Sequence, residues 1–338
     1  GWIGQAAALS TSSSPIALTS DDKQVWSVNP DNDSVSVINV EGDANTKLAE
    51  IPVGDEPQCV AITPDDKTAY VTNQIDGTVS VIDVATRVVT KTIKVGTEPF
   101  GCALTPDGAK LYVSNFNAES VSVINTATNR LLRTIKNVGP KPRGIATTTD
   151  GKVYVTLFLA QLRAGKTPAD EGQDDAKEGR VVVISSSNDK VVDTVELNPI
   201  ADTGFKSLGS VLKRIRFLAA DPATFVTTAA YPNLLENIAI KGDRAYVPNT
   251  CQSPDGASRL NVNVQSCVSV FDTVNDLDSN QTLNMNKGVG NEPVGQRLFN
   301  TNPIATAFKH NADEGFAVLA ATNRIIKVEL EAGAPTVN

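Results

Sequence analysis

The stretch Tyr70-Val-Thr-Asn73 returns 42 residues later as Tyr112-Val-Ser-Asn115, and after another 42 residues as Tyr154-Val-Thr-Leu157. A second phrase, Val-Ser-Val-Ile followed by Asn or Asp, keeps step with it at 35–39, 79–83 and 121–125. A fixed period of this length outweighs any local motif, because a repeat architecture builds the whole fold from one unit.

Each repeat is predicted to form four short strands. In the second repeat they span 57–63, 68–72, 78–84 and 88–95. Val, Ile, Thr and Tyr dominate these runs, and Gly, Asp, Asn and Pro separate them. Four strands in about 42 residues are typical of one blade of a β-propeller, and the 3.6-residue period of a helical solenoid is absent. The sequence therefore predicts an all-β chain that forms a β-propeller of four-stranded blades.

Six repeats are visible, and together they predict a single propeller domain over 1–338: about 14–56, 57–98, 99–141, 142–200, 233–300 and 301–338. The sixth repeat is expected to stop after its third strand, at 324–331, because Gly333-Ala-Pro335 has the composition of a connection. A missing outer strand would leave apolar faces and strand edges exposed. We therefore expect seven blades in the intact protein, the seventh encoded beyond Asn338 or supplied by another chain and closed by residues 3–9. The alternative is a six-bladed ring, in which residues 3–9 complete the sixth blade.

Three stretches interrupt the period, at 159–179, 201–232 and 250–266. Up-and-down strand alternation predicts that all three emerge on the same propeller face, over two adjacent blades. Long loops on one face of a rigid scaffold commonly carry function, although tolerated surface drift is the alternative. In the second stretch, apolar residues at i, i+3, i+4 and i+7 predict a short amphipathic helix over 208–215. Its basic residues lie off the apolar stripe: Lys213, Arg214 and Arg216.

Charged residues flank the prolines that open the first strand of several repeats: Glu56, Glu98, Arg143 and Glu292. They are predicted to ring the mouth of the central channel, where they either bind a ligand or keep the mouth hydrated. Together with the three basic residues of the predicted helix, they form the candidate ligand- or partner-binding set.

No residue is predicted to be catalytic. His310 is the single histidine, and its turn is expected on the face opposite the insertions, without an orienting partner. Asp276-Leu-Asp-Ser-Asn280 begins like a calcium loop but lacks the glycine and the glutamate that complete one. We interpret it as a turn between strands and predict no metal site. The acidic run at 170–178 is interpreted as a solvated loop.

The four cysteines include no Cys-x-x-Cys pair, so no covalent haem site is predicted in this chain. Cys251 and Cys267 bracket 15 residues of one hairpin and are predicted to form a disulfide, which would stabilise the fold by about 3 kcal/mol. Such a bond requires an oxidising compartment. Cys59 and Cys102 are offset by one residue in neighbouring repeats, so a second disulfide and two buried thiols are equally consistent with their spacing.

Composition narrows the function classes. The chain has 30 basic and 38 acidic residues, a net charge of −8 and a pI near 4.9, which argues against a nucleic-acid partner. No run of 18 apolar residues occurs, so no transmembrane helix is predicted.

The repeated phrases resemble those of the YVTN-repeat β-propellers of bacterial and archaeal secreted and surface proteins. The resemblance is strong over 50–150 and weaker over 180–338. It implies a propeller, usually of seven blades, in an exported location, either periplasmic or extracellular at the cell surface. The repeats around 231–239 and 299–304 resemble the propeller part of larger bacterial proteins, some of which carry a c-type cytochrome segment.

The preferred interpretation is a non-catalytic exported binding or docking module, part of a larger protein or complex. Two alternatives stay open. One is a propeller that docks, or is fused to, a c-type haem electron-transfer protein, with the haem on a partner or on a segment outside this chain. The other is a propeller lactonase or hydrolase, which would need clustered acid and base residues at the channel.

Overall fold

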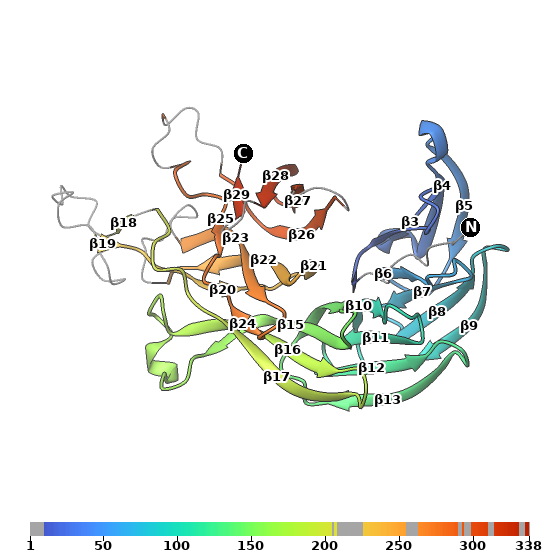
Figure 1. The fold of residues 1–338 in the computed structure, drawn as a ribbon, viewed down its shortest axis with the longest axis horizontal. Helices are drawn as coiled ribbons and strands as arrows, with labels where there is room; N and C mark the ends of the chain where they lie inside the picture. Colours follow the sequence, from blue (N-terminus) through green and yellow to red (C-terminus); the bar gives the residue numbers. More distant parts are fainter. Residues whose placement is uncertain are drawn as a thin grey trace, which may run out of the picture. The chain divides into compact units, whose positions relative to one another are not determined.

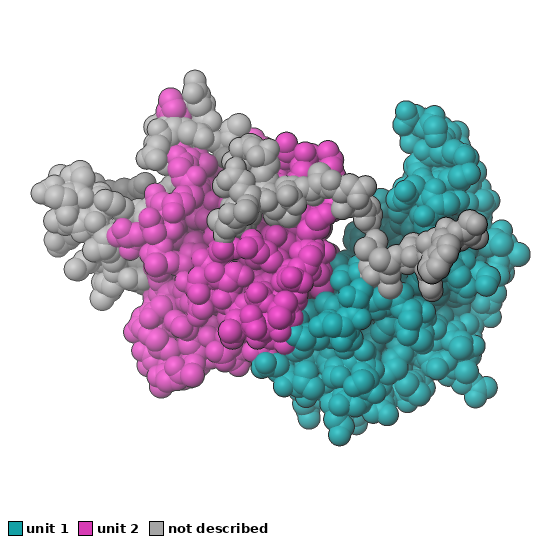
Figure 2. Space-filling view, viewed as in Figure 1, with its two compact units in different colours: residues 1–155, 182–193 teal, residues 156–181, 194–338 magenta. Residues whose placement is uncertain are grey.

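The computed structural model describes residues 10–204, 206–207, 226–254, 263–289, 293, 299–309, 314–330 and 335–337. The chain divides into two compact units. Unit 1 comprises residues 1–155 and 182–193, and unit 2 comprises residues 156–181 and 194–338 (Figure 2). The division passes through the fourth repeat.

The first three repeats each form a four-stranded antiparallel sheet (Figure 1). The first sheet contains β2 (Ile16–Leu18), β3 (Gln24–Asn29), β4 (Ser34–Asn39) and β5 (Thr46–Pro52). The second contains β6 (Pro57–Ile62), β7 (Thr68–Asn73), β8 (Thr78–Asp83) and β9 (Val88–Lys94). The third contains β10 (Pro99–Leu104), β11 (Lys110–Asn115), β12 (Ser120–Asn125) and β13 (Arg130–Lys136). The strands of the second repeat lie where the sequence predicts them.

The later repeats carry longer or interrupted strands. The fourth sheet contains β14 (Pro142–Thr147), β15 (Lys152–Leu162), β16 (Lys177–Ser185) and β17 (Lys190–Leu197). The fifth contains β20 (Tyr231–Asn233), β21 (Ala239–Lys241), β22 (Arg244–Gln252), β23 (Val264–Asp272), β24 (Leu277–Asp278) and β25 (Leu283–Asn284). The sixth contains β26 (Pro303–Phe308), β27 (Glu314–Leu319), β28 (Arg324–Leu330) and β29 (Pro335–Val337).

Apart from one short ribbon, β18 (Lys206–Ser207) with β19 (Val226–Thr227), every described strand belongs to one of six small antiparallel sheets. Short 3₁₀ turns complete the structure: η1 (Pro30–Asn32), η2 (Glu41–Asp43) and η3 (Pro168–Asp170). Six sheets of this kind confirm the predicted all-β class and a β-propeller with six blades. None of the helices in the described part of the chain is long and apolar enough to cross a membrane.

The strand alternation explains how neighbouring sheets pack. Tyr70 and Val71 are consecutive in β7, so their side chains point to opposite faces of the second sheet. Val71 joins a buried cluster with Trp26 and Val37 of the first sheet. Tyr70 joins another, with Leu111 and Val113 of the third sheet. The second repeat therefore buries both faces of its sheet, and this explains its nearly continuous apolar runs.

One expectation about the sixth repeat is wrong. Residues 335–337 form its outer strand, β29, which pairs with β28 through Val328 and Val337. Proline is accepted at the first residue of an edge strand because no ladder hydrogen bond is needed there. Pro335 therefore opens a strand and not a connection. The expectation of a seventh blade rested on the missing strand and on the family resemblance; six blades are described, and residues 3–9 lie outside the described part.

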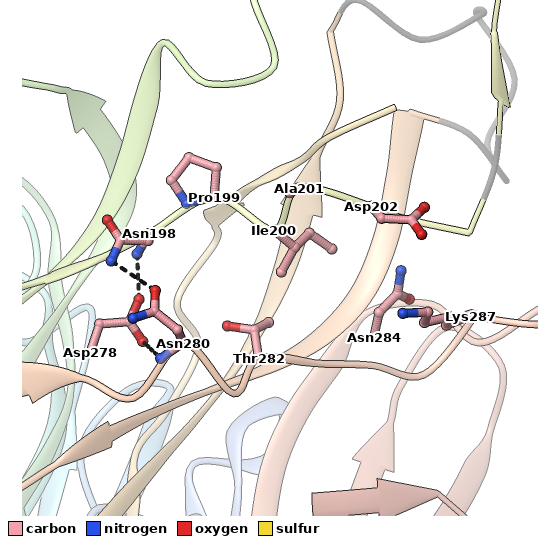
Figure 3. A pocket seen from close by; sticks show the side chains of 10 residues that line it. All are labelled: Asn198, Pro199, Ile200, Ala201, Asp202, Asp278, Asn280, Thr282, Asn284 and Lys287. Atoms are coloured by element: carbon pink, nitrogen blue, oxygen red, sulfur yellow. Dashed lines mark hydrogen bonds between the residues drawn. The ribbon is translucent and has the colours of Figure 1, made fainter. Parts of the chain in front are cut away.

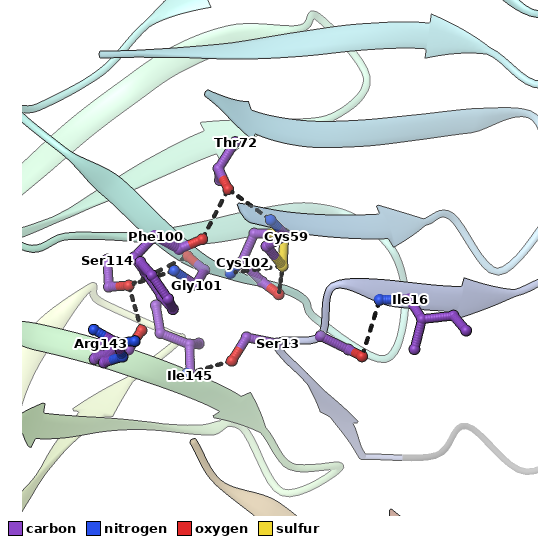
Figure 4. The surroundings of a disulfide bond; sticks show 11 residues. Ser13, Ile16, Cys59, Thr72, Phe100, Gly101, Cys102, Ser114, Arg143 and Ile145 are labelled. Carbon is purple, nitrogen blue, oxygen red and sulfur yellow. Dashed lines mark hydrogen bonds between the residues drawn. A yellow bond between two sulfur atoms is a disulfide. The ribbon is translucent and has the colours of Figure 1, made fainter. Parts of the chain in front are cut away.

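A second departure involves the N-terminal segment of unit 1. β1 (Thr11–Ser12) pairs antiparallel with β14, so the fourth sheet gains a fifth strand. Ser13 N–H donates to Ile145 O at 2.7 Å, and Ile145 N–H donates to Ser13 Oγ at 3.0 Å (Figure 4). Val60 N–H in β6 donates to Ser14 O at 3.0 Å. This strap, residues 11–14, therefore bonds to innermost strands from two different sheets.

Candidate binding surface formed by the insertions

The first insertion begins and ends as regular strand. β15 and β16 contain 11 and 9 residues, whereas the matching strands β7 and β8 contain 6 each. β22 and β23 in the fifth sheet are lengthened in the same way, to 9 residues each. The first and third insertions therefore begin and end as extensions of the hairpins β15–β16 and β22–β23.

The charges of the first insertion are largely paired within it. Glu178 is buried, and it receives the guanidinium groups of Arg180 at 2.9 Å and Arg163 at 3.4 Å. Lys166 pairs with Asp175 at 3.0 Å, and Lys177 pairs with Glu171 at 3.1 Å. The run of acids is therefore not a free anionic patch, because basic residues of the same hairpin offset it.

Asp174 connects all three insertions. Its Oδ2 accepts a hydrogen bond from Ala229 N–H at 3.1 Å, at the end of the second insertion. Its Oδ1 accepts one from the Ser253 hydroxyl at 3.0 Å, in the third insertion. The second and third insertions also meet directly, where Tyr231 Oη donates to Gln252 Oε1 at 3.3 Å. We call the described residues of these segments the insertion surface: 159–179, 201–204, 206–207, 226–232, 250–254 and 263–266. Whether all three emerge on one propeller face stays a prediction.

The surroundings of Tyr231 raise the pKa of its phenol. Burial raises the pKa of this phenol, and the nearby carboxylates of Glu171 and Asp174 raise it further. The side chain therefore stays a neutral hydrogen-bond donor at physiological pH.

The predicted disulfide between Cys251 and Cys267 is confirmed, with the two Cα atoms 5.9 Å apart. Both cysteines are buried against Ala230, and Ile200 packs on the same cluster. Ile200 and Ala230 form a β-bridge between the two ends of the second insertion. The disulfide therefore closes the third insertion, and the two ends of the second insertion pack against it.

The second disulfide, Cys59–Cys102, is also formed, with a Cα–Cα distance of 5.9 Å (Figure 4). It joins β6 of the second sheet to β10 of the third. Cys59 pairs with Thr72 in its sheet, whereas Cys102, which lies one position further along its own repeat, pairs with Val113. The one-residue offset places the two side chains on opposite faces of their sheets, and the packing of the second sheet on the third brings the two sulfur atoms together.

The predicted mouth residues of unit 1 have mixed surroundings. Glu56 is exposed and has a backbone φ of +50°, and Glu98, at φ +52°, accepts a hydrogen bond from the Asn117 amide. The Arg143 guanidinium lies over the Phe100 ring at 4.0 Å and 5.8 Å from the Phe116 ring centre. These three residues remain candidates. Glu292, Lys213, Arg214, Arg216, the predicted helix over 208–215 and His310 all lie outside the described residues.

The repeated tyrosines are structural. Tyr70 Oη donates to Asn129 Oδ1 at 2.6 Å, and Tyr112 Oη donates to Asp189 Oδ1 at 2.5 Å. Each acceptor occupies the same turn of the following blade, with φ near +51° and +55°. Asn and Asp tolerate this left-handed conformation better than other side-chain-bearing residues.

The asparagine of the phrase is equally structural. Asn115 Nδ2 donates to Ser120 and Ser122, and its Oδ1 accepts from Gly96 N–H at 3.1 Å. A Cβ atom at Gly96 would collide with the Asn115 side chain, and this explains the glycine that opens the repeat.

A pocket of about 340 Å³ lies in unit 2, between the chain that follows β17 and the outer edge of the fifth sheet (Figure 3). Sequence reasoning missed it, although the signal was present. In the fifth repeat, residues 276–284 carry six Asp, Ser, Asn or Gln side chains where the second repeat has the strand Val88–Lys94. The lining residues are Asn198, Pro199, Ile200, Ala201, Asp202, Asp278, Asn280, Thr282, Asn284 and Lys287.

The Asp276–Asn280 segment contributes Asp278 and Asn280 to this pocket. Asp278 accepts backbone hydrogen bonds from Asn198 at 2.8 Å and Asn280 at 3.0 Å. Among the described residues, no group of three or more His, Cys, Asp or Glu side chains is placed to hold a metal ion.

Comparisons with known proteins agree with this architecture. The sequence profile of the YNCE-like β-propellers matches residues 4–100 and 68–164. The Kuenenia stuttgartiensis hydrazine synthase structure is 17% identical, with a TM-score of 0.67 over 98% of this chain and 81% of that chain. The Myceliophteria thermophila Cps50 (Swd1) β-propeller domain is 10% identical, with a TM-score of 0.56 over 97% of this chain and 88% of that chain. At these identities the similarity shows the fold alone. No curated protein matches the sequence.

Proposed function

We propose that this chain, whose residues 4–164 match the YNCE-like β-propellers, is a non-catalytic, exported binding module that docks a protein partner on its insertion surface. The observation that carries this proposal is the position of Asp174. This residue belongs to the first insertion, and its carboxylate accepts hydrogen bonds from the second and the third. Three departures from the repeat thus share one set of contacts, and a preorganised surface binds with less loss of conformational entropy.

The character of the insertion surface favours a protein over a small charged ligand. Its acidic residues are offset by lysines and arginines of the same hairpin, and Leu159 is 40% exposed on it. Mixed polar groups around exposed apolar side chains are typical of non-obligate protein interfaces.

The two disulfides support export. Disulfides persist in oxidising compartments and are rare in the cytosol of most organisms. The proposed location is therefore the periplasm or the cell surface, and no cofactor is proposed within these 338 residues.

Site-specific photocrosslinking in the native host tests the docking role. A photoreactive phenylalanine analogue at Leu159 should give a defined crosslinked product. The same analogue at Leu131, on β13 of unit 1, provides the control, because the two leucines are 40% and 41% exposed. Equal crosslinking from both positions, or none from Leu159, would contradict the proposal.

Two further measurements distinguish the alternative functions, a haem electron-transfer complex and a hydrolase. A crosslinked partner with covalent haem would show a Soret band and would identify an electron-transfer complex. Hydrolysis of a lactone by the purified chain, without partner, would instead identify a hydrolase.

A further inference from the structure

The fifth blade departs from the repeat at its outer strand. The outer strands β5, β9, β13 and β17 are continuous over 7 or 8 residues. In the fifth sheet the outer strand is split into β24 and β25, of 2 residues each. Ser279 N–H still donates to Val270 O of β23 at 3.0 Å, residues 280–282 lie outside both short strands, and the pocket of about 340 Å³ lies against this interruption. The fold itself does not require the departure, since four other blades do without it.

The pocket is polar at both ends. In Figure 3 the Asn198, Asp278 and Asn280 side chains gather at one end, while Asp202 and Lys287 lie toward the other. Ile200 provides an apolar wall between the ends. A volume near the lower limit of about 300–1,000 Å³ for small-molecule sites suits a ligand of one or two rings.

Hydrogen bonds hold the first end in place. Each oxygen of Asp278 accepts one backbone N–H, from Asn198 or Asn280, and keeps a further lone pair. Asn198 Nδ2 donates to Asn280 Oδ1 at 3.2 Å, so the Asn280 NH₂ group retains its donors. Carboxylate acceptors and amide donors therefore stand next to each other in fixed orientations.

Asp202, Thr282 and Lys287 add further hydrogen-bond acceptors and donors to the pocket. Asp202 Oδ1 accepts the Gly204 N–H at 2.8 Å, and the Thr282 hydroxyl donates to Ser269 Oγ at 3.3 Å. Both keep acceptor capacity toward the pocket. Lys287 is exposed, and within the described residues its ammonium forms no ion pair or hydrogen bond. It is available to donate to a ligand.

Charge excludes several ligand classes. Two carboxylates against one ammonium disfavour an anion, and the ammonium and amide donors disfavour a bare metal cation. The numerous polar groups disfavour an apolar ligand, because they would be left without partners. A neutral molecule that carries both donors and acceptors on adjacent carbons satisfies all of these constraints.

We propose that the pocket between Asn198–Asp202 and Asp278–Lys287 binds a neutral saccharide, with its vicinal hydroxyl groups on the Asp278 and Asn280 side chains. The burial that raises the pKa of Asp278 is consistent with a carboxyl that meets a neutral hydroxyl group and not a second charge. This inference goes beyond the docking role and does not rest on it.

Ligand titration tests the proposal. The probes are D-glucose, D-galactose and N-acetyl-D-glucosamine, and the disaccharides maltose, lactose and chitobiose, followed by saturation-transfer NMR and calorimetry. Binding of a monosaccharide would indicate a free sugar as the ligand, and binding of disaccharides alone would indicate a glycan chain. Either result supports the proposal.

Two variants locate the binding. Thr282→Val and Asp202→Ala should each weaken binding about five- to tenfold, since each removes one hydrogen-bonding group. Thr92→Val and Asp31→Ala are the matched controls, because both residues are exposed and lie in unit 1. Circular dichroism confirms that each variant is folded.

Three outcomes overturn the inference. They are no binding of any saccharide by the folded protein, saccharide binding that the pocket variants leave unchanged, and preferential binding of an amino acid or a diamine. None of them affects the crosslinking test, which probes Leu159 in the first insertion, outside the residues that line the pocket, and needs no sugar.

Discussion

The phenol of Tyr112 shows how one residue type joins successive blades. Its hydroxyl donates to Asp189 at 2.5 Å, and Lys110 and Arg133 contact the same carboxylate at 2.8 and 3.5 Å. Tyr70 makes the equivalent contact to a neutral group, Asn129. The repeat thus keeps the donor and varies the charge of the acceptor.

This pair of contacts predicts unequal costs of deletion. Tyr112→Phe should lower the free energy of unfolding by about 2 kcal/mol, because hydrogen bonds to charged groups contribute about 1.5–3 kcal/mol. Tyr70→Phe should cost about 1 kcal/mol, the usual value for a neutral pair. Urea denaturation followed by circular dichroism measures both. Equal losses would show that the charge of the acceptor has no influence.

The same tyrosines predict an alkaline loss of stability. Burial, with a smaller contribution from Asp65, raises the pKa of Tyr70 from 10.0 to about 12. Burial and the hydrogen bond to Asp189 also raise the pKa of Tyr112. Between the tyrosine pKa of 10.0 in the unfolded chain and the raised pKa in the folded chain, the unfolded chain releases protons that the folded chain keeps. The free energy of unfolding is therefore maximal below pH 10 and falls as the pH rises.

Urea midpoints at pH 8, 10 and 11 check this expectation, and Tyr70→Phe should fall less steeply than the unchanged protein. Tyrosinate absorbance should show that some of the five tyrosines ionise only when the chain unfolds. Full ionisation of all five in the folded protein near pH 10 would refute it.

At the scale of elements, the two disulfides differ in what they close. Cys251–Cys267 closes a sequence separation of 16 residues within one hairpin, and Cys59–Cys102 closes 43 residues between two sheets. In the chain-entropy model, the longer loop contributes about 1 kcal/mol more. The shorter one, however, supports the insertion surface through Ile200 and Ala230.

Two double variants separate these effects. Cys251→Ser with Cys267→Ser should cost about 3 kcal/mol and expose the third insertion to limited proteolysis. Cys59→Ser with Cys102→Ser should cost about 4 kcal/mol and leave that insertion protected. Thermal denaturation and peptide mapping report the two quantities, and cleavage of the third insertion in both variants would count against a local role for Cys251–Cys267.

At the scale of the whole molecule, the strap of residues 11–14 joins parts of unit 1 that are far apart in sequence. Ser13 exchanges two hydrogen bonds with Ile145, and Ser14 accepts one from Val60. Thr11 Oγ1 also donates to Leu104 O at 2.6 Å. The strap therefore reaches the innermost strands of three sheets.

Ser13→Pro should lower the free energy of unfolding by about 2–4 kcal/mol, because it removes the N–H donor and the hydroxyl acceptor from a buried position. Hydrogen exchange at the Ile145 and Val60 amides should accelerate. Ser10→Pro is the control, since the backbone of Ser10 makes none of the strap's contacts. Unchanged exchange in Ser13→Pro would mean that the strap does not stabilise these strands.

Sequence alone determined the repeat and most of its strands, because blade strands are local, periodic and punctuated by turn residues. It also predicted the Cys251–Cys267 bond, whose partners share one hairpin. Pro335 misled the prediction because proline begins an edge strand as readily as it ends one.

Tertiary structure decided everything that depends on residues distant in sequence. The Cys59–Cys102 bond, the strap on β14, the joint at Asp174 and the polar pocket join residues between 43 and 136 positions apart. Period and composition describe which face a side chain occupies, but not which distant group it meets there. These contacts between distant residues depend on how the folded elements pack on one another, and this packing brings the candidate binding groups together.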